Sequence, residues 1–535
     1  MEKYVKHPLI KDKTIERRIY QETLLVSCAN QNSLIVLPTG LGKTIIAFLI
    51  SVHRLNKFPN SKIVFLAPTK PLVEQHYQTF KDKVKLEESL LSIITGNIVP
   101  DKRKILWENS KIIFITPQTL QNDISENRVN NFSTSLIIFD EAHRAVGNYA
   151  YCFLAQNYMD NADNPLIIAL TASPGDEEKI NEVKNNLFIK NFEILDEKSK
   201  EVAPYIQKIE IEKRLIDLPN EFNQIKAIIE KKLKYYLKEL KKNKFIKTIN
   251  LKEINKKDLL AVQGKIQAKI KSGEKTNENF ESVKNIATSI KLSHMLELLE
   301  TQGLASLNAY FKKMKGGRTK SDLIIINDEQ MEKLENIMHN LISKNIDHPK
   351  IEELKLILKE QLQENEQSRI IVFIHYRVSA QKIVETLKTL KKINPIRFIG
   401  QQSKRGDKGL SQKEQIEILQ KFRNGEYNVL VATSVAEEGL DISECDLVVF
   451  YEAVPSSIRA IQRRGRTGRK SPGKVIMLIA KGTRDEGYYW SSVSKEKKMK
   501  KTLKKLQNNS VDTEQKKSKI DSKQTKIDRF LENKK

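Results

Sequence analysis

Two segments far apart in this chain carry residue types suited to binding and hydrolysing a nucleotide. Residues 38–44 read PTGLGKT; they follow an apolar run and open an apolar stretch with helical spacing. Glycines let a backbone approach phosphate oxygens closely, and the amide groups of a helix N-terminus attract anions. Residues 462–469 read QRRGRTGR and can supply positive charge to a leaving γ-phosphate. We therefore expect two lobes that close on one ATP, since neither segment alone makes a complete site.

The first segment departs from the strict phosphate-loop pattern GxxxxGK[ST], because Leu37 stands at the first glycine position. The remaining part keeps the required context between a strand and a helix. Lys43 is expected to reach the β- and γ-phosphates, and Thr44 is expected to bind Mg²⁺. A chance glycine turn before a helix is the alternative. The rest of the expected ATP-binding loop is Pro38, Thr39, Gly40, Leu41 and Gly42.

A short acidic sequence, DEAH, follows another apolar run. Asp140 is placed to hold Mg²⁺, directly or through water, and Glu141 is the expected base or water-orienting residue. Alone, this sequence reads equally well as an exposed acidic turn, but the phosphate loop upstream favours the catalytic interpretation. In the arginine-rich segment, Arg466 and Arg469 are the arginine-finger candidates. A basic loop that contacts phosphates without a catalytic role is the alternative there.

Short apolar runs must form the scaffold that positions these residues. They do not alternate with polar residues, which is typical of strands buried on both faces of a parallel sheet. In the first half of the chain each run ends at a polar cluster, and ligands gather at the carboxyl ends of such strands. The runs are residues 34–37, 63–67, 112–115, 136–139 and 166–170, then 370–374, 396–399, 429–432, 447–450 and 475–479.

The strand pattern disappears between the two halves, where apolar residues recur at helical spacing. Residues 231–271 hold fourteen lysines against three acidic residues, which favours contact with nucleic acid over a merely solvated face. We expect an α/β fold of two parallel-sheet domains with an all-α insert between them and a disordered C-terminal tail. The predicted boundaries are 1–219 and 346–494 for the α/β domains, 220–345 for the insert and 495–535 for the tail.

The overall composition narrows the class of protein. The formal net charge is +26, from 93 basic and 67 acidic residues, which suits a polyanionic partner such as nucleic acid. The three cysteines are scattered, so neither a disulfide framework nor a zinc site is expected. The sequence shows no signal peptide and no run of the roughly 18 apolar residues that cross a bilayer. We expect an intracellular protein, cytoplasmic or nucleoid-associated, without membrane contact.

Several further motifs appear in order and resemble those of superfamily 2 helicases and translocases with two RecA-like lobes. This resemblance implies ATP and Mg²⁺ as cofactors. It assigns nucleotide contact to Arg18, Gln21 and Gln462, and the coupling of hydrolysis to movement to His143, Thr171, Ser173 and Asp441. It assigns contact with the nucleic-acid strand to Thr69, Lys70, Thr116, Gln118, Arg377 and Thr433.

Longer matches point to one branch of that superfamily. Residues 291–303 (KLSHMLELLETQG), 347–350 (DHPK) and 397–415 resemble the Hef and FANCM family. The resemblance implies a DNA translocase acting on forks, Holliday junctions and related branched DNA, with the insert gripping the duplex. No XPF-like nuclease motif ERKxxxD occurs, so we expect remodelling without cutting, with a separate nuclease as a candidate partner. The alternatives are a duplex-RNA translocase of the RIG-I or Dicer type and a non-catalytic, clamp-associated scaffold.

The C-terminal sequence QTKIDRFL resembles a PCNA-interacting peptide. Gln524 would orient the peptide, while Ile527, Phe530 and Leu531 would enter a pocket of the sliding clamp. The alternative is a frayed terminal turn with stray apolar residues. Its place at the end of a polar, basic tail is suited to a tether.

Overall fold

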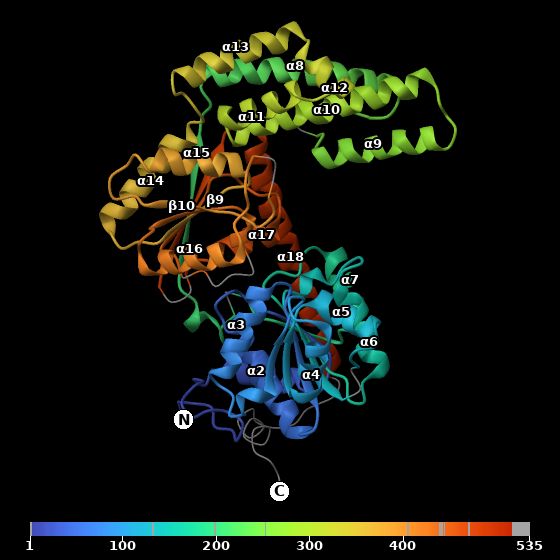
Figure 1. Ribbon diagram of the computed structural model, residues 1–535, viewed down its shortest axis with the longest axis vertical. Helices are drawn as coiled ribbons and strands as arrows, with labels where there is room; N and C mark the ends of the chain where they lie inside the picture. The colour runs from blue at the N-terminus through green and yellow to red at the C-terminus, as the bar shows by residue number, and fades with distance from the viewer. Residues whose placement is uncertain are drawn as a thin grey trace.

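The computed structural model describes residues 3–130, 133–196, 199–251, 253–403, 406–437, 442, 444–468 and 471–515, with only the backbone described for residues 507–515. Figure 1 shows two α/β domains and a helical domain arranged in a row, with the helical domain at the end away from the first α/β domain. The predicted α/β fold class, with two parallel-sheet domains and an all-α insert, is thereby confirmed. No helix in the described part of the chain is long and apolar enough to cross a membrane.

The first domain is built on a seven-stranded parallel sheet with the strand order β3-β4-β2-β5-β6-β1-β7. Strands such as β1 and β5 are buried along their whole length, because helices cover both faces. Helices α1 to α3 pack on one face and α4 to α7 on the other. The strands are β1 Ser33–Val36, β2 Lys62–Leu66, β3 Leu91–Ile94, β4 Ile112–Ile115, β5 Thr134–Phe139, β6 Ile167–Thr171 and β7 Asn191–Ile194. The helices are α1 Ile19–Cys28, α2 Lys43–Lys57, α3 Lys70–Lys81, α4 Pro100–Asn109, α5 Pro117–Ser125, α6 Ala150–Asn161 and α7 Glu177–Asn186, with short 3₁₀ turns η1 Glu88–Leu90, η2 Ala142–Arg144 and η3 Ala203–Tyr205.

The second domain has a six-stranded parallel sheet with the order β10-β11-β9-β12-β13-β8. Its helices again cover both faces of the sheet. The strands that follow the insert are β9 Ile370–Phe373, β10 Pro395–Phe398, β11 Val429–Ala432, β12 Leu447–Phe450 and β13 Gly473–Ala480. The helices are α14 Lys350–Glu364, α15 Arg377–Leu387, α16 Gln412–Asn424 and α17 Ser457–Arg464, with the 3₁₀ turn η4 Ser434–Ala436.

One strand crosses the predicted domain boundary. The boundary at residue 219 leaves β8, Ile209–Ile216, in the first domain, whereas β8 pairs along its whole length with β13 of the second sheet. The prediction is wrong at this point because β8 is an edge strand. Several of its residues are exposed, so it lacks the continuous apolar run by which the other strands were recognised. Arg214 on β8 also pairs with Glu353 of α14 at 3.2 Å.

The insert is all helical, as predicted, and has its own apolar core. Leu233, Leu237 and Leu240 on α8 are buried in it, since residues three and four apart share one face of a helix. The turn between α10 and α11 contains Gly303 in the left-handed region, with φ of 97°. The helices are α8 Asn220–Lys242, α9 Lys256–Lys271, α10 Asn277–Thr301, α11 Leu304–Lys315, α12 Lys320–Ile326 and α13 Glu329–Ser343.

The last described helix, α18 (Arg484–Gln515), replaces part of the predicted disordered tail. It begins in the second domain and runs down to the first, as Figure 1 shows. Met499 and Leu503 lie four residues apart and are buried in the core of the first domain. The prediction of disorder from residue 495 is therefore wrong as far as residue 515. Lysines dominate this stretch, and the two apolar residues gain their burial only from a domain distant in sequence.

Candidate nucleotide site between the two domains

The phosphate loop follows β1 and leads directly into α2. Gly40 and Gly42 both adopt left-handed backbone conformations, with φ of 85° and 75°. Gly42 is the N-cap of α2, so the first amide groups of that helix are directed toward the loop. A β-carbon on Gly42 would lie 2.7 Å from Gln21 Nε2. The left-handed turn favours glycine here, whereas the flexible Gln21 side chain could move aside from a β-carbon.

Helix α1 supports the loop from the side, through two of the residues predicted to contact the nucleotide. Gln21 donates to the Tyr20 hydroxyl at 3.2 Å, and Tyr20 donates to the Leu41 carbonyl at 2.7 Å. The Arg18 guanidinium lies 4.9 Å from the centre of the Tyr205 ring. Arg18 Nη1 also donates to the Tyr20 hydroxyl at 3.4 Å, so Gln21 and Arg18 both reach the phosphate loop through Tyr20. Tyr20 was not singled out from the sequence, although it lies between them.

Lys43 and Asp140 both belong to the candidate nucleotide site, but their side chains contact different neighbours. Lys43 Nζ donates to the Leu37 carbonyl at 3.0 Å and to the Pro38 carbonyl at 3.4 Å, so its ammonium lies over the loop. Burial raises the pKa of Asp140, but the nearby His76 and Lys43 outweigh it and keep this pKa below its usual range. The carboxylate is therefore ionised at neutral pH.

His76 on α3 connects the two residues predicted to bind Mg²⁺. Its Nε2 lies 2.8 Å from Asp140 Oδ2, and its Nδ1 lies 3.3 Å from the Thr44 hydroxyl. A hydroxyl and an ionised carboxylate are oxygen ligands of the kind that Mg²⁺ prefers, so these residues fit the ion. Sequence reasoning missed His76, because an isolated histidine inside a helix carries no motif.

The predicted coupling residues form a chain leading away from this site. His143 Nδ1 lies 3.3 Å from the Thr171 hydroxyl and 3.3 Å from a Glu141 carboxylate oxygen. The Thr171 hydroxyl accepts the Ser173 amide at 3.1 Å, and the Ser173 hydroxyl contacts Met499 Sδ at 3.2 Å. Helix α18, which carries Met499, therefore contacts Ser173, the last residue in this series of hydrogen bonds. Glu141 has a left-handed backbone with φ of 49°. The predicted coupling residue Asp441 lies outside the described residues.

The arginines of α17 and the turn after it gather around Glu437. Arg459 donates two hydrogen bonds to the Glu437 carboxylate, at 2.7 and 2.8 Å, and Arg463 Nε donates one at 2.8 Å. Arg466 donates to the Glu437 carbonyl at 2.7 Å. Burial raises the pKa of Glu437, but Arg459 and Arg463 outweigh it and lower the pKa overall. Gln462 is buried on the same helix, and the finger candidate Arg469 lies outside the described residues.

The arginine-rich segment and the phosphate loop meet across the two domains. A β-carbon on Gly465 would lie 2.1 Å from the Thr39 hydroxyl and 2.8 Å from Thr39 Cβ. Nearby, a β-carbon on Gly175 of the first domain would lie 3.7 Å from Ile458 of the second. The two segments singled out from the sequence thus meet where the two domains are in contact.

The residues predicted to contact nucleic acid lie at the carboxyl ends of strands, in one group for each sheet. Thr69 and Thr116 precede α3 and α5 as their N-caps, and Gln118, the second residue of α5, is exposed. Arg377 begins α15 and donates to the Gly400 carbonyl at 3.0 Å. The Thr433 amide donates to the Phe398 carbonyl at 3.0 Å. Lys70 begins α3 and lies 3.6 Å from Glu74.

Comparison with known proteins assigns the chain to a family. The helicase domain of Pyrococcus furiosus Hef is 46% identical in sequence, and its structure superposes with a TM-score of 0.70, covering 90% of this chain and all of that one. The chain belongs to the Hef and FANCM family of superfamily 2 helicases. Three family descriptions match it: "Type III restriction enzyme, res subunit" over residues 13–176, "Putative ATP-dependent RNA helicase, helical bundle" over 221–346, and "Helicase conserved C-terminal domain" over 350–471.

Curated relatives of the Hef and FANCM type match nearly the whole chain. The putative ATP-dependent RNA helicase MJ1505 of Methanocaldococcus jannaschii is 42% identical over 94% of this chain and 63% of its own length. The ATP-dependent DNA helicase fml1 of Schizosaccharomyces pombe is 34% identical over 87% of this chain and 57% of its own length. The chain thus spans less than two thirds of either relative. The two names also differ in the nucleic acid that they give.

Proposed function

We propose that this chain is an ATP-dependent DNA helicase or translocase that remodels branched DNA during the repair and recombination of replication forks. The observation that carries the proposal is the contact between Gly465 and Thr39, which places an arginine-rich segment against a phosphate loop. Such an interdomain site can respond to the relative position of the two domains. Membership of the Hef and FANCM family supports DNA as the substrate.

Each residue of the site has a proposed role in this activity. Lys43 and the amides of α2 bind the phosphates, while Thr44 and Asp140 would hold Mg²⁺, which supplies positive charge to the phosphate oxygens. Glu141 orients the attacking water. Arg466, with Arg469, stabilises the charge that develops on the transferred phosphoryl group. In this structure one guanidinium nitrogen of Arg466 donates to the Glu437 carbonyl.

The proposed DNA contacts come from both sheets and from the insert. Thr69, Thr116 and Gln118 contact the strand from the first sheet, and Arg377 and Thr433 from the second. Positive charge on the insert and elsewhere supplies affinity that is independent of base sequence. Binding should therefore weaken steeply as salt is raised. Because the proposed substrate is chromosomal DNA, we expect the protein to be located at the nucleoid.

ATPase measurements test the proposal. Wild type and Lys43→Ala are compared with forked DNA, linear duplex DNA or duplex RNA, and we expect the fork to stimulate wild type most. The turnover of Lys43→Ala should fall by roughly a hundredfold or more. Equal rates in the two proteins would contradict the proposal that the chain is an ATP-driven motor. Stronger stimulation by duplex RNA would favour the RNA activity that the name of MJ1505 carries.

We also propose that the C-terminal peptide binds the sliding clamp PCNA. Its residues, Gln524, Ile527, Phe530 and Leu531, lie outside the described residues, and the support is the sequence pattern alone. Deleting residues 524–535 should abolish capture by immobilised clamp, while DNA-stimulated ATPase persists. Capture that is unaffected by the deletion contradicts the proposal. A separate nuclease is a further proposed partner, and its association is testable by co-purification.

A further inference from the structure

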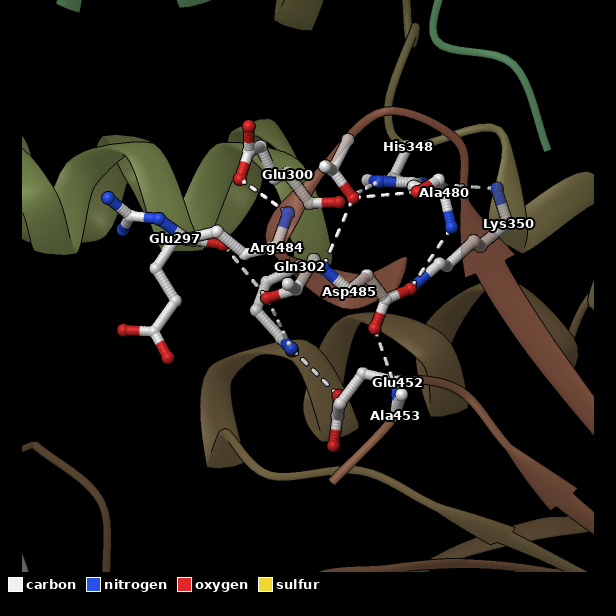
Figure 2. Close-up of polar contacts among 12 residues, drawn as sticks. Glu297, Glu300, Gln302, His348, Lys350, Glu452, Ala453, Ala480, Arg484 and Asp485 are labelled. Atoms are coloured by element: carbon white, nitrogen blue, oxygen red, sulfur yellow. Dashed lines mark hydrogen bonds and ion pairs between the residues drawn. The ribbon is translucent and has the colours of Figure 1, made fainter. Parts of the chain in front are cut away.

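The turn between α10 and α11 contacts the second domain through a buried polar network, shown in Figure 2. This turn ends the KLSHMLELLETQG block that singled out the family. Gln302 Nε2 donates to Glu452 Oε2 at 2.7 Å, and both side chains are buried. Gln302 belongs to the insert, whereas Glu452 follows β12 of the second sheet. The family-specific block therefore reaches the ATPase domain directly.

Neighbouring contacts hold this turn firmly in place. Glu300 accepts the Arg484 amide at 3.1 Å and pairs with Lys226 at 2.9 Å. The Ser306 hydroxyl lies 2.7 Å from the Ser379 hydroxyl of α15. A movement of the insert is therefore transmitted to the second domain through a packed junction.

Glu452 is also coupled electrostatically to Arg463 of the arginine-rich segment, which contacts the Phe450 ring two residues before it. Its Oε1 is buried and has no hydrogen-bond partner among the described residues, and the same holds for Arg463 Nη1 and Nη2. The guanidinium lies against the rings of both Phe373 and Phe450, 4.9 and 5.4 Å from their centres, and is attracted electrostatically by Glu452. Burial raises the pKa of Glu452 to about 7, against the opposing effects of Arg463 and Gln302.

Unsatisfied buried polar atoms are costly, at about 1–3 kcal/mol each, and the two groups carry opposite charge when Glu452 is ionised. Arg463 shares Glu437 with Arg459, and its helix leads directly to Gly465 at the phosphate loop. A change at Glu452 can therefore reach the nucleotide site through α17.

We propose that Glu452 is a positioning residue that couples the helical insert to the nucleotide site. Gln302 holds one carboxylate oxygen from the insert side, and the ionised form of Glu452 attracts Arg463 and sets its position. This inference rests on the proposed DNA-stimulated ATPase and adds the route by which DNA held at the insert changes turnover. Glu452 and Gln302 do not contact the phosphate loop, so their effect is on stimulation and not on the basal reaction.

The test uses the full chain with forked DNA and compares Glu452→Gln, Gln302→Leu and the double variant. We expect each single variant to reduce the ratio of stimulated to basal ATPase by roughly tenfold, within the usual range of coupling between sites. Basal ATPase and DNA affinity should stay within about twofold, and the double variant should lose no more than either single one. Ser306→Ala is the matched control, because it removes another contact of the same junction and should retain stimulation.

A swap, Gln302→Glu with Glu452→Gln, separates positioning from mere stability. It restores an amide-to-carboxylate hydrogen bond but moves the negative charge away from Arg463. We expect the melting temperature to recover and stimulation to stay low. Recovery of stimulation in the swap, equal loss in Ser306→Ala, or additive losses in the double variant would overturn the proposal. Absence of stimulation in wild type would instead contradict the proposed function, while the melting temperatures still test the hydrogen bond.

Discussion

Gly465 of the second domain lies directly against Thr39 of the first, so that a β-carbon at Gly465 would come within 2.1 Å of the Thr39 hydroxyl. Threonine is short and branched at Cβ, and it has little freedom to move aside. The contact therefore requires glycine on one side and fixes how closely the two halves of the site approach. It connects the phosphate loop with the arginines of α17.

The first prediction concerns this contact. Gly465→Ala should force the segments apart and lower DNA-stimulated turnover by roughly a hundredfold, the loss that a misplacement of about 1 Å can cause. Steady-state ATPase measures it. Gly487→Ala is the control, because a β-carbon at Gly487 in α18 would meet only open space, and alanine suits a helix. Similar rates in both variants would contradict the importance of the contact.

The second prediction concerns the docking of α18 on the first domain. Met499→Ala or Leu503→Ala should each lower the free energy of unfolding by about 2–5 kcal/mol, because each removes a buried side chain. Urea denaturation measures the change. Lys501→Ala, at an exposed position of the same helix, should stay within about 0.5 kcal/mol of wild type. If the three variants unfold alike, the helix does not dock in solution.

The third prediction concerns pH. Burial, and then the Lys350 ammonium, lower the pKa of His348 from 6.5 to about 3. His348 Nδ1 accepts the Lys350 amide at 3.2 Å and Nε2 lies 3.0 Å from the Glu300 carbonyl, so both nitrogens are used in the neutral ring. The unfolded chain takes up a proton near the ordinary pKa, whereas the folded chain does not. The stabilisation is therefore complete above the ordinary pKa and is lost as pH falls toward about 3.

Chemical denaturation near neutral pH and at about pH 5 measures this dependence. His348 should account for about 2 kcal/mol of the lost unfolding free energy, and His348→Gln should remove that part. His339→Gln is the control, because the His339 side chain is 54% exposed. If the free energy of unfolding of His348→Gln depends on pH as it does in wild type, the pKa of His348 is not lowered in the folded protein.

The fourth prediction concerns the ion pair of Lys350 and Asp485, which lie 2.6 Å apart with neither side chain exposed. Asp485 also accepts the amides of Ala453 and Ala480. Lys350→Met or Asp485→Leu should each cost about 3–5 kcal/mol, because each leaves a buried charge unpaired. The double variant should cost less than the sum, as a double-mutant cycle on urea unfolding can measure. Simple additivity would mean that the two charges do not interact.

The amino-acid sequence alone determined the local elements and the order of the motifs. Continuous apolar runs such as residues 112–115 and 429–432 became β4 and β11, because a strand buried on both faces must be apolar throughout. The phosphate loop was recognisable because its glycines and Lys43 stand at fixed spacing between a strand and a helix. The helical insert was recognisable from its period, as at Leu233 and Leu237.

Only the tertiary structure decided which distant residues meet. Strand β8 joins the second sheet, and Met499 on α18 is buried in the first domain. His76 lies between Thr44 and Asp140, and Gln302 reaches Glu452. None of these contacts leaves a periodic signal, because sequence periodicity records which face of one element is buried and not what covers it. Burial of charged groups in particular depends on partners that the fold brings from far along the chain.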